Sequence, residues 1–321
     1  MLNLISPSAW SLAAREARDG PYVAGARTTR PLLRLLLFVL AAAVFLFAIV
    51  VALGALAAAG DAAGWLDLEM FNGEFTTSSL ADETAFLAAL AVVLSALAAG
   101  LLLAAMLVYR QGPAAFLWPR PRGGAGLFLA GFGVMFLVAL ALWPVMQWLE
   151  PGGPAPLLDA SETLNARLTY AGAAAVGLLA AAAAEEVAFR GVLLRITGGF
   201  TRHLTLILLI NGVLFSAIHL DPDPVAFVAR AASGMVWAWA ALRLGSLAFA
   251  IGAHLANNLF IALMLAPISE AAQPGQDLPL EVLGLEAVSL IVVLIAVEVL
   301  ARRRPGGDPD QRNGNRTALV G

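Results

Sequence analysis

Ionisable and carboxamide side chains, together with one phenylalanine, occur at regular spacing inside three segments that are otherwise apolar. In chain order these residues are Glu185, Glu186, Arg190, Phe215, His219, His254 and Asn258. A carboxylate can take a proton from water, an imidazole can carry that proton, and a carboxamide can donate a hydrogen bond to an oxyanion. The set therefore contains a base, proton carriers and an oxyanion donor.

The apolar surroundings of these residues restrict where they can lie. One charged side chain in the middle of a bilayer costs roughly 2.5–3.5 kcal/mol. Glu185, Glu186 and Arg190 would together cost about ten kcal/mol if they faced lipid. We therefore expect them to face the interior of a helix bundle or a wet cavity, where an unshared acid is a candidate functional group.

Helical spacing predicts different surroundings for the two adjacent glutamates. Residues four apart share a helix face, so Glu186 and Arg190 are predicted to pair. Glu185 points about 100° away from Glu186 and is predicted to remain unpaired. The alternative for the Glu186–Arg190 pair is a purely structural role, as a buried ion pair that fixes helix packing.

The two histidine motifs use the same spacing of four. Phe-Ser-Ala-Ile-His places Phe215 and His219 on one helix face, and His-Leu-Ala-Asn-Asn does the same for His254 and Asn258. The alternative for each histidine is a hydrogen bond between helices, while Phe215 and the neighbouring Asn257 are assigned to packing. His219 falls near the outer end of its segment, so a tilt, a kink or a late helix start must bring it inward.

The composition of the whole chain indicates a bilayer environment. Of 321 residues, 60% are apolar and 13% are charged, with a mean hydropathy of +0.85. Several apolar runs exceed the roughly 20 residues that cross a hydrocarbon core as a helix. We predict an all-α integral membrane fold, a polytopic bundle of about eight transmembrane helices. The predicted spans are 32–58, 84–109, 125–148, 168–194, 204–219, 225–242, 246–266 and 282–301.

Charged residues alternate between the segments that connect these spans. Arginines precede the first span, follow the last and occupy the second, fourth and sixth loops, whereas the other loops are acidic and contain Arg167 as their one arginine. Such alternation is typical of the positive-inside rule. Both termini are therefore predicted to be cytoplasmic, in a multi-pass protein of the cell (inner) membrane.

A single membrane domain, residues 32–301, is predicted. Residues 1–31 form a cytoplasmic segment in which 9–18 is either a short interfacial helix or a disordered leader. Residues 302–321 are polar and are predicted to be a disordered cytoplasmic tail. The sequence contains no repeat at a fixed period.

Several other chemistries are excluded by composition and motif. The absence of cysteine excludes disulfides, thiolate nucleophiles and zinc–thiolate sites. The sequence contains neither a His-Glu-x-x-His zinc motif nor a Gly-x-Ser-x-Gly serine elbow. Nothing in the sequence resembles a nucleic-acid-binding face, so no nucleic-acid partner is expected.

Three motifs, in their order along the chain, resemble those of a known family. Glu-Glu-x-x-x-Arg followed by Gly, then Phe-x-x-x-His, then His-x-x-x-Asn just before the final span resemble the CAAX-protease and bacteriocin-processing (CPBP) family of intramembrane proteases. The resemblance covers residues 168–265. It implies an endopeptidase that acts on a membrane-associated protein or peptide. Eukaryotic relatives remove the last three residues of prenylated CAAX proteins, and bacterial relatives are linked to peptide maturation and bacteriocin self-immunity.

The resemblance also implies a role for each motif residue. Glu185 would activate a water molecule, assisted by His219. His254 and Asn258 would stabilise the tetrahedral oxyanion. The residues that would hold the site together are Glu186 and Arg190.

A zinc enzyme is the alternative to a metal-free mechanism. Glu185, His219 and His254 are acceptable zinc ligands by type, and the family has often been called metalloprotease. The three residues lie on separate segments, without the spacing of four that two ligands on one metal-binding helix would have. We therefore expect no cofactor to be required.

Two functions of other classes use the same residues. A proton-coupled transporter would employ the buried acids as a relay, but inverted repeats would be expected of it. A membrane scaffold or immunity protein would keep the motif residues and act by binding. The prediction retained is a glutamate-type intramembrane endopeptidase whose partners are the lipid bilayer and a membrane-associated substrate.

Overall fold

A computed structural model describes residues 7–64, 79–119, 124–149, 155–271 and 278–303 of the chain. Every regular element within these ranges is helical, which confirms the predicted all-α membrane fold. The elements are α1 (Pro7–Asp19), α2 (Pro21–Ala24), α3 (Pro31–Ala62), α4 (Leu80–Tyr109), α5 (Pro113–Leu117), α6 (Gly124–Leu149), α7 (Leu164–Glu186), η2 (Val187–Leu193), α8 (Leu194–Phe200), α9 (Leu204–Ala217), α10 (Pro224–Leu244), α11 (Ala248–Met264), α12 (Ile268–Ala271) and α13 (Glu281–Arg302). The predicted tail, residues 302–321, lies outside the described residues except for its first two.

Each of the eight predicted spans corresponds to one of these apolar helices. By length and composition, six are able to cross a membrane: α3, α4, α6, the continuous helix from α7 through η2 to α8, α10 and α13. The other two, α9 and α11, are shorter apolar helices of 14 and 17 residues. At about 1.5 Å per residue, α9 is roughly 21 Å long, which is less than the ~30 Å thickness of a hydrocarbon core.

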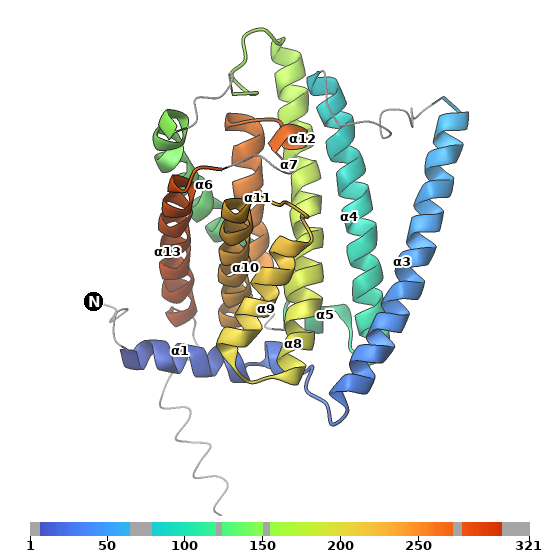
Figure 1. Cartoon of the computed structure of the whole chain (residues 1–321), viewed down its shortest axis with the longest axis vertical. Helices are drawn as coiled ribbons and strands as arrows, with labels where there is room; N and C mark the ends of the chain where they lie inside the picture. Colours follow the sequence, from blue (N-terminus) through green and yellow to red (C-terminus); the bar gives the residue numbers. More distant parts are fainter. Residues whose placement is uncertain (1–6, 65–78, 120–123, 150–154, 272–277, 304–321) are drawn as a thin grey trace, which may run out of the picture.

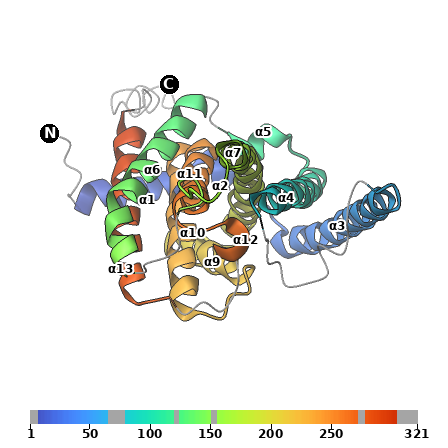
Figure 2. The same cartoon turned by 90° about the horizontal axis from the view of Figure 1, so that it is seen from above.

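The long helices run side by side, with α3 at one edge of the array and α13 at the other (Figures 1 and 2). α11 packs against α6, α7 and α10, so it occupies the interior of the bundle. α1 lies across one end of the bundle, nearly perpendicular to the other helices (Figure 1). It contains the predicted segment 9–18.

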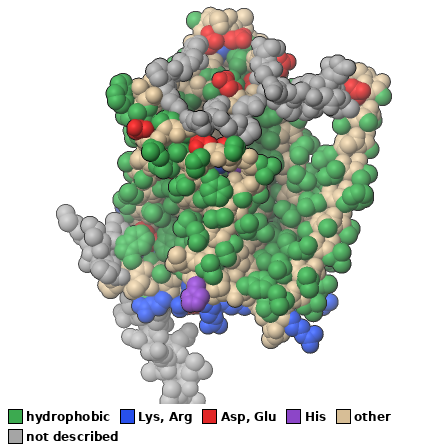
Figure 3. Space-filling model, viewed as in Figure 1, with side chains coloured by type: hydrophobic (Ala, Val, Ile, Leu, Met, Phe, Trp, Pro, Cys, Tyr) green, Lys and Arg blue, Asp and Glu red, His purple; other side chains and the backbone are tan. Residues whose placement is uncertain are grey.

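Side-chain types are segregated along the bundle axis. Figure 3 shows a hydrophobic band with arginines at the edge where α1 lies and acidic residues towards the opposite edge. The band is the surface that a bilayer would cover. Its charged margins follow the alternation of arginine-rich and acidic loops in the sequence.

A buried ion cluster holds α1 against the bundle. The Arg243 guanidinium of α10 donates to both carboxylate oxygens of Glu298 in α13, at 2.8 and 3.0 Å, and to Glu16 of α1 at 3.0 Å. Trp10 of α1 lies against Trp239, with ring centroids 6.1 Å apart. These contacts cover the arginine-bearing end of α10 and α13 with an amphipathic helix.

Two helix crossings are close enough to require glycine. A Cβ added to Gly212 of α9 would overlap the Ala231 carbonyl oxygen of α10, and one added to Gly234 of α10 would lie 2.9 Å from the Gly212 Cα. A Cβ on Gly252 of α11 would likewise overlap the Phe128 carbonyl oxygen of α6. Close backbone approach of this kind lets helices pack without a hydrophobic driving force in lipid. It brings α9 against α10 and α11 against α6.

Candidate functional site

The first motif lies where a long helix changes its hydrogen-bonding pattern. α7 ends at Glu186, and η2 continues from Val187 as a π-helix. Within η2, the Phe189 carbonyl oxygen accepts from the Leu194 amide and also, at 2.9 Å, from the Asn211 side chain of α9. π-helical segments are rare and frequent at functional sites. Here the Asn211 side chain holds the π-helical segment, which carries Arg190, against α9.

The predicted Glu186–Arg190 pair is present. Arg190 Nη1 donates to Glu186 Oε1 at 2.9 Å, and both side chains are fully buried. Arg190 Nη2 donates to the Gly234 carbonyl oxygen of α10 at 3.1 Å. The guanidinium carbon also lies 4.3 Å from the centre of the Phe215 ring, within the range of a cation–π interaction. Arg190 therefore joins three helices through one buried charge.

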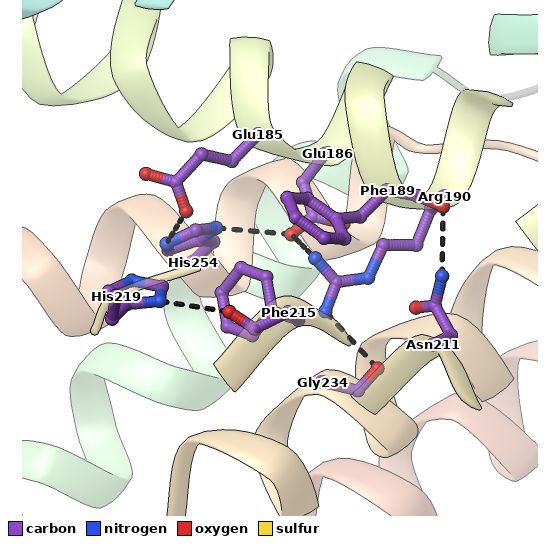
Figure 4. Close-up of polar contacts among 9 residues, drawn as sticks. All are labelled: Glu185, Glu186, Phe189, Arg190, Asn211, Phe215, His219, Gly234 and His254. Carbon is purple, nitrogen blue, oxygen red and sulfur yellow. Dashed lines mark hydrogen bonds and ion pairs between the residues drawn. The ribbon is translucent and has the colours of Figure 1, made fainter. Parts of the chain in front are cut away.

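His254 of α11 lies between the two adjacent glutamates (Figure 4). Its Nδ1 is 3.0 Å from Glu186 Oε1, and its Nε2 is 3.8 Å from Glu185 Oε2. An ionised carboxylate only accepts hydrogen bonds, so the Glu186 contact requires a proton on Nδ1. This arrangement leaves Nε2 directed at Glu185.

Glu185 makes no ion pair with Arg190 among the described residues, in agreement with the helical spacing, and its ionisable neighbour is His254. The Glu185 Oε2 makes no hydrogen bond among the described residues, although that atom is buried. The side chain is 18% exposed and lines a cavity of about 450 Å³. Of the two glutamates, only Glu185 lines this cavity, since Glu186 is fully buried beside Arg190. A water molecule or a substrate in the cavity would therefore meet Glu185.

His219 reaches the same cavity because α9 is short. The helix ends at Ala217, and Leu220 adopts a left-handed conformation (φ 53°) that turns the chain immediately afterwards. His219 Nδ1 lies 2.9 Å from the Phe215 carbonyl oxygen, so it donates to that oxygen and leaves Nε2 free of this contact. The predicted fifth span, 204–219, thus runs two residues past the end of α9.

Aromatic rings fill the space between these polar groups. The Phe215 ring lies 5.2 Å from the His219 ring and 5.9 Å from the His254 ring, both in edge-on geometry. Trp237 of α10 stacks on His254 with centroids 4.4 Å apart. Phe215 contacts both histidines and Arg190, and it also lines the cavity. Trp237 was not predicted, because nothing in its local spacing marks it.

The cavity contains further polar residues that the motif analysis missed. Asn258 lines it as expected, but so does Asn257, whose amide nitrogen donates to the Asn258 Oδ1 at 3.2 Å. The assignment of Asn257 to packing was therefore wrong. Glu286 of α13 also lines the cavity and accepts a hydrogen bond from Ser233 of α10. The rule that a bilayer rejects an isolated acid in an apolar helix would have identified Glu286.

The three candidate zinc ligands can be compared with a metal-binding geometry. Within the described residues, no group of three or more His, Cys, Asp or Glu side chains is placed to hold a metal ion. Glu185, His219 and His254 line one cavity, and each histidine is held through Nδ1, by Glu186 for His254 and by a backbone carbonyl for His219. Such contacts also orient metal-binding histidines, so the case for a metal-free site rests on the lack of a converging ligand group among the described residues.

Comparisons with known proteins find similarity in the same region of the chain. Residues 167–260 match the family model described as type II CAAX prenyl endopeptidase Rce1-like. An 88-residue stretch is 33% identical to the uncharacterized protein YyaK of Bacillus subtilis (strain 168), covering 26% of this chain and 29% of that protein. The match thus spans less than a third of this relative. No solved structure is significantly similar to the chain.

Proposed function

We propose that this multi-pass membrane protein is an intramembrane endopeptidase, because residues 167–260 match the family model of Rce1-like type II CAAX prenyl endopeptidases. Its substrate is a membrane-associated protein or peptide, of the CAAX type or a precursor of a processed peptide. One observation carries the proposal: the half-buried Glu185 carboxylate faces His254 Nε2 across 3.8 Å at the wall of a cavity, and its Oε2 makes no hydrogen bond among the described residues. A cavity within the bundle admits water to a peptide bond while excluding lipid.

In the proposed mechanism, Glu185 takes a proton from a water molecule, and the resulting hydroxide adds to the peptide carbonyl carbon. The oxyanion so formed accepts hydrogen bonds from the Asn258 amide and, when Nε2 carries a proton, from His254. Collapse of the intermediate breaks the C–N bond, and the leaving nitrogen takes the proton from Glu185, with His219 assisting. The products are a new carboxyl terminus and a free amine.

Two hydrogen bonds made by neighbouring residues orient the groups that act on the substrate. The Glu186 carboxylate fixes the Nδ1–H tautomer of His254, which makes Glu186 a positioning residue rather than a catalytic one. The Asn257 amide donates a hydrogen bond to Asn258 Oδ1, which leaves the Asn258 NH₂ group as a donor towards the cavity. The Asn257 contact thus prepares a donor for an oxyanion before substrate arrives. The Glu186 contact orients the His254 ring, and its Nε2 becomes a donor only when it also takes up a proton.

The function is tested with purified protein and a fluorescent peptide carrying a farnesylated cysteine three residues before its carboxyl end. Unlipidated peptide and a membrane-anchored precursor peptide are assayed in parallel, and the products are mapped by mass spectrometry. We expect release of the three-residue end or one defined internal cut. Proton flux into proteoliposomes that depends on Glu185, without any cleavage, would instead support a transporter. Peptide binding that depends on the motif, without cleavage or flux, would support a scaffold or immunity protein.

The mechanism requires no metal. Exhaustive chelation should leave the cleavage rate constant within about twofold of its initial value, because Glu185, His219 and His254 do not converge as a ligand group among the described residues. The measurement is peptide cleavage before and after chelation, together with the metal content of the protein. Loss of activity that zinc alone restores would make these three residues ligands and would contradict the proposal.

We propose that the arginine-bearing end of the bundle and both termini face the cytoplasm, across the cell membrane. The support is the separation of arginine from acidic residues at the two ends of the bundle (Figure 3). Reporter domains fused after Gln111 or Arg303 should report the cytoplasmic side, and those fused after Ala63 or Ser161 the opposite side. Finding the Ala63 and Gln111 reporters on one side would contradict this orientation.

A further inference from the structure

A second pocket lies at the arginine-bearing end of the bundle, and it shares no residue with the cavity that contains Glu185. Its volume is about 290 Å³, and it is formed where the start of α3 meets the end of α4. Seven residues line it: Thr28, Thr29, Arg30, Leu33, Arg34, Leu37 and Arg110. All of them lie outside residues 167–260, so the family match gives this pocket no function.

The pocket has three cations and no anion. None of its lining residues is acidic, and no ion pair of the described residues includes Arg30, Arg34 or Arg110. Arg34 donates one Nη1 hydrogen bond to the Val108 carbonyl oxygen, which holds α3 against α4. Arg30 and Arg110 are exposed side chains directed at the same pocket. Three uncompensated guanidinium groups at one place attract an anion.

The start of α3 strengthens this field. The first amide groups of a helix carry partial positive charge, which acidic residues normally offset. The first turn of α3 has no acidic residue, and Arg30 stands at its N-cap without a side-chain cap hydrogen bond. Arginines at this end of a helix are unfavourable on their own. A bound anion would satisfy the helix end and the arginines together.

Below the arginines the pocket becomes apolar. Leu33 and Leu37, one turn apart on α3, line the pocket and are 45% and 43% exposed. α3 is the helix at the edge of the bundle, and its apolar window is only 11% buried. A ligand in this pocket therefore meets guanidinium and hydroxyl groups at one end and an open hydrocarbon-facing helix surface at the other.

We propose that this pocket binds an anionic phospholipid. Arg30, Arg34 and Arg110 hold the phosphate, with the hydroxyl groups of Thr28 and Thr29 beside it. One acyl chain runs along Leu33 and Leu37. A phospholipid would contact both the polar and the apolar half of the pocket, whereas inorganic phosphate would contact only the polar half. Bound lipid would fix α3 against α4 next to the end of the bundle that α1 covers.

The test uses the full-length protein in neutral detergent, titrated with phosphatidylglycerol or phosphatidylcholine and read by native mass spectrometry. An Arg30→Gln/Arg110→Gln variant removes two of the cations and spares Arg34, which bonds the Val108 carbonyl. We expect the wild type to bind phosphatidylglycerol at least tenfold more tightly than phosphatidylcholine. We expect the variant to lose about 25-fold in phosphatidylglycerol affinity, at roughly fivefold per arginine beside a membrane phosphate.

A matched control distinguishes lipid binding in this pocket from non-specific attraction to surface charge. Arg202→Gln/Arg303→Gln removes two exposed arginines at the same end of the bundle but outside the pocket. This control should stay within about twofold of the wild type, and Arg110→Gln alone should lose about fivefold. Equal binding of the two lipids, or an equal loss in the control, would overturn the proposal. Displacement of phosphatidylglycerol by an equal concentration of inorganic phosphate would assign the pocket to free phosphate and overturn it as well.

Discussion

Glu185→Gln is expected to lower the rate constant of peptide cleavage by about 10²–10⁴-fold, the contribution typical of a general base. The carboxamide keeps the shape of the side chain but cannot take a proton from water. The fold should be unaffected, because Glu185 Oε2 has no hydrogen-bond partner among the described residues. The buried Arg190 guanidinium keeps its ion pair with Glu186. Cleavage of the lipidated peptide and thermal melting in detergent are measured on the same preparation.

Glu286→Gln is the matched comparison for this variant. It makes the same substitution on another acid of the same cavity, which is contributed by α13 and accepts from Ser233 rather than facing a histidine. We expect this protein to keep at least a tenth of the wild-type rate constant, a loss below that typical of a general base. A larger loss in Glu286→Gln than in Glu185→Gln would assign the base to α13 and contradict the proposed mechanism.

Glu186→Gln is expected to act first on stability. The substitution leaves the Arg190 guanidinium fully buried without a carboxylate, and breaking a buried pair in this way costs about 3–5 kcal/mol. The free energy of unfolding in mixed micelles measures the loss. The glutamine oxygen still accepts from His254 Nδ1, so the protein that remains folded should retain part of its cleavage activity.

A double variant distinguishes the lost ion pair from other effects. Glu186→Gln combined with Arg190→Met removes the stranded charge and leaves an apolar side chain of similar length. Because replacing both members of a buried pair is often close to neutral, the double variant should recover most of the stability that the single variant loses. A Glu186→Gln protein as stable as the wild type would show that the pair does not compensate the buried arginine.

Local periodicity was sufficient to predict the helices and one contact of the site. Hydropathy identified eight apolar spans because the requirement to satisfy every backbone hydrogen bond in lipid leaves helices as the simple solution. The pairing of Glu186 with Arg190 follows from a spacing of four, and it survives the change to a π-helix at Val187. Both predictions depend only on neighbours along the chain.

Contacts between helices could not be predicted in this way. The bond from His254 to Glu186 joins residues 68 positions apart, and its presence depends on how α11 packs against α7. The inward position of His219 depends on the short α9 and on the turn at Leu220. The Asp-Pro-Asp-Pro run that follows marks a helix end, but it does not indicate where the His219 side chain points. Asn211 fixes the π-helix from another helix altogether. Such features arise from tertiary packing rather than from pattern.

Side-by-side cleavage by the Glu185→Gln and Glu186→Gln proteins tests the central claim most directly. The first-order rate constant for the lipidated peptide is measured for each protein and divided by its folded fraction at the assay temperature. We predict a fully folded Glu185→Gln protein without measurable cleavage and a destabilised Glu186→Gln protein with residual cleavage. A folded Glu185→Gln protein that still cleaves, beside a stable Glu186→Gln protein that does not, would contradict the assignment of Glu185 as the base.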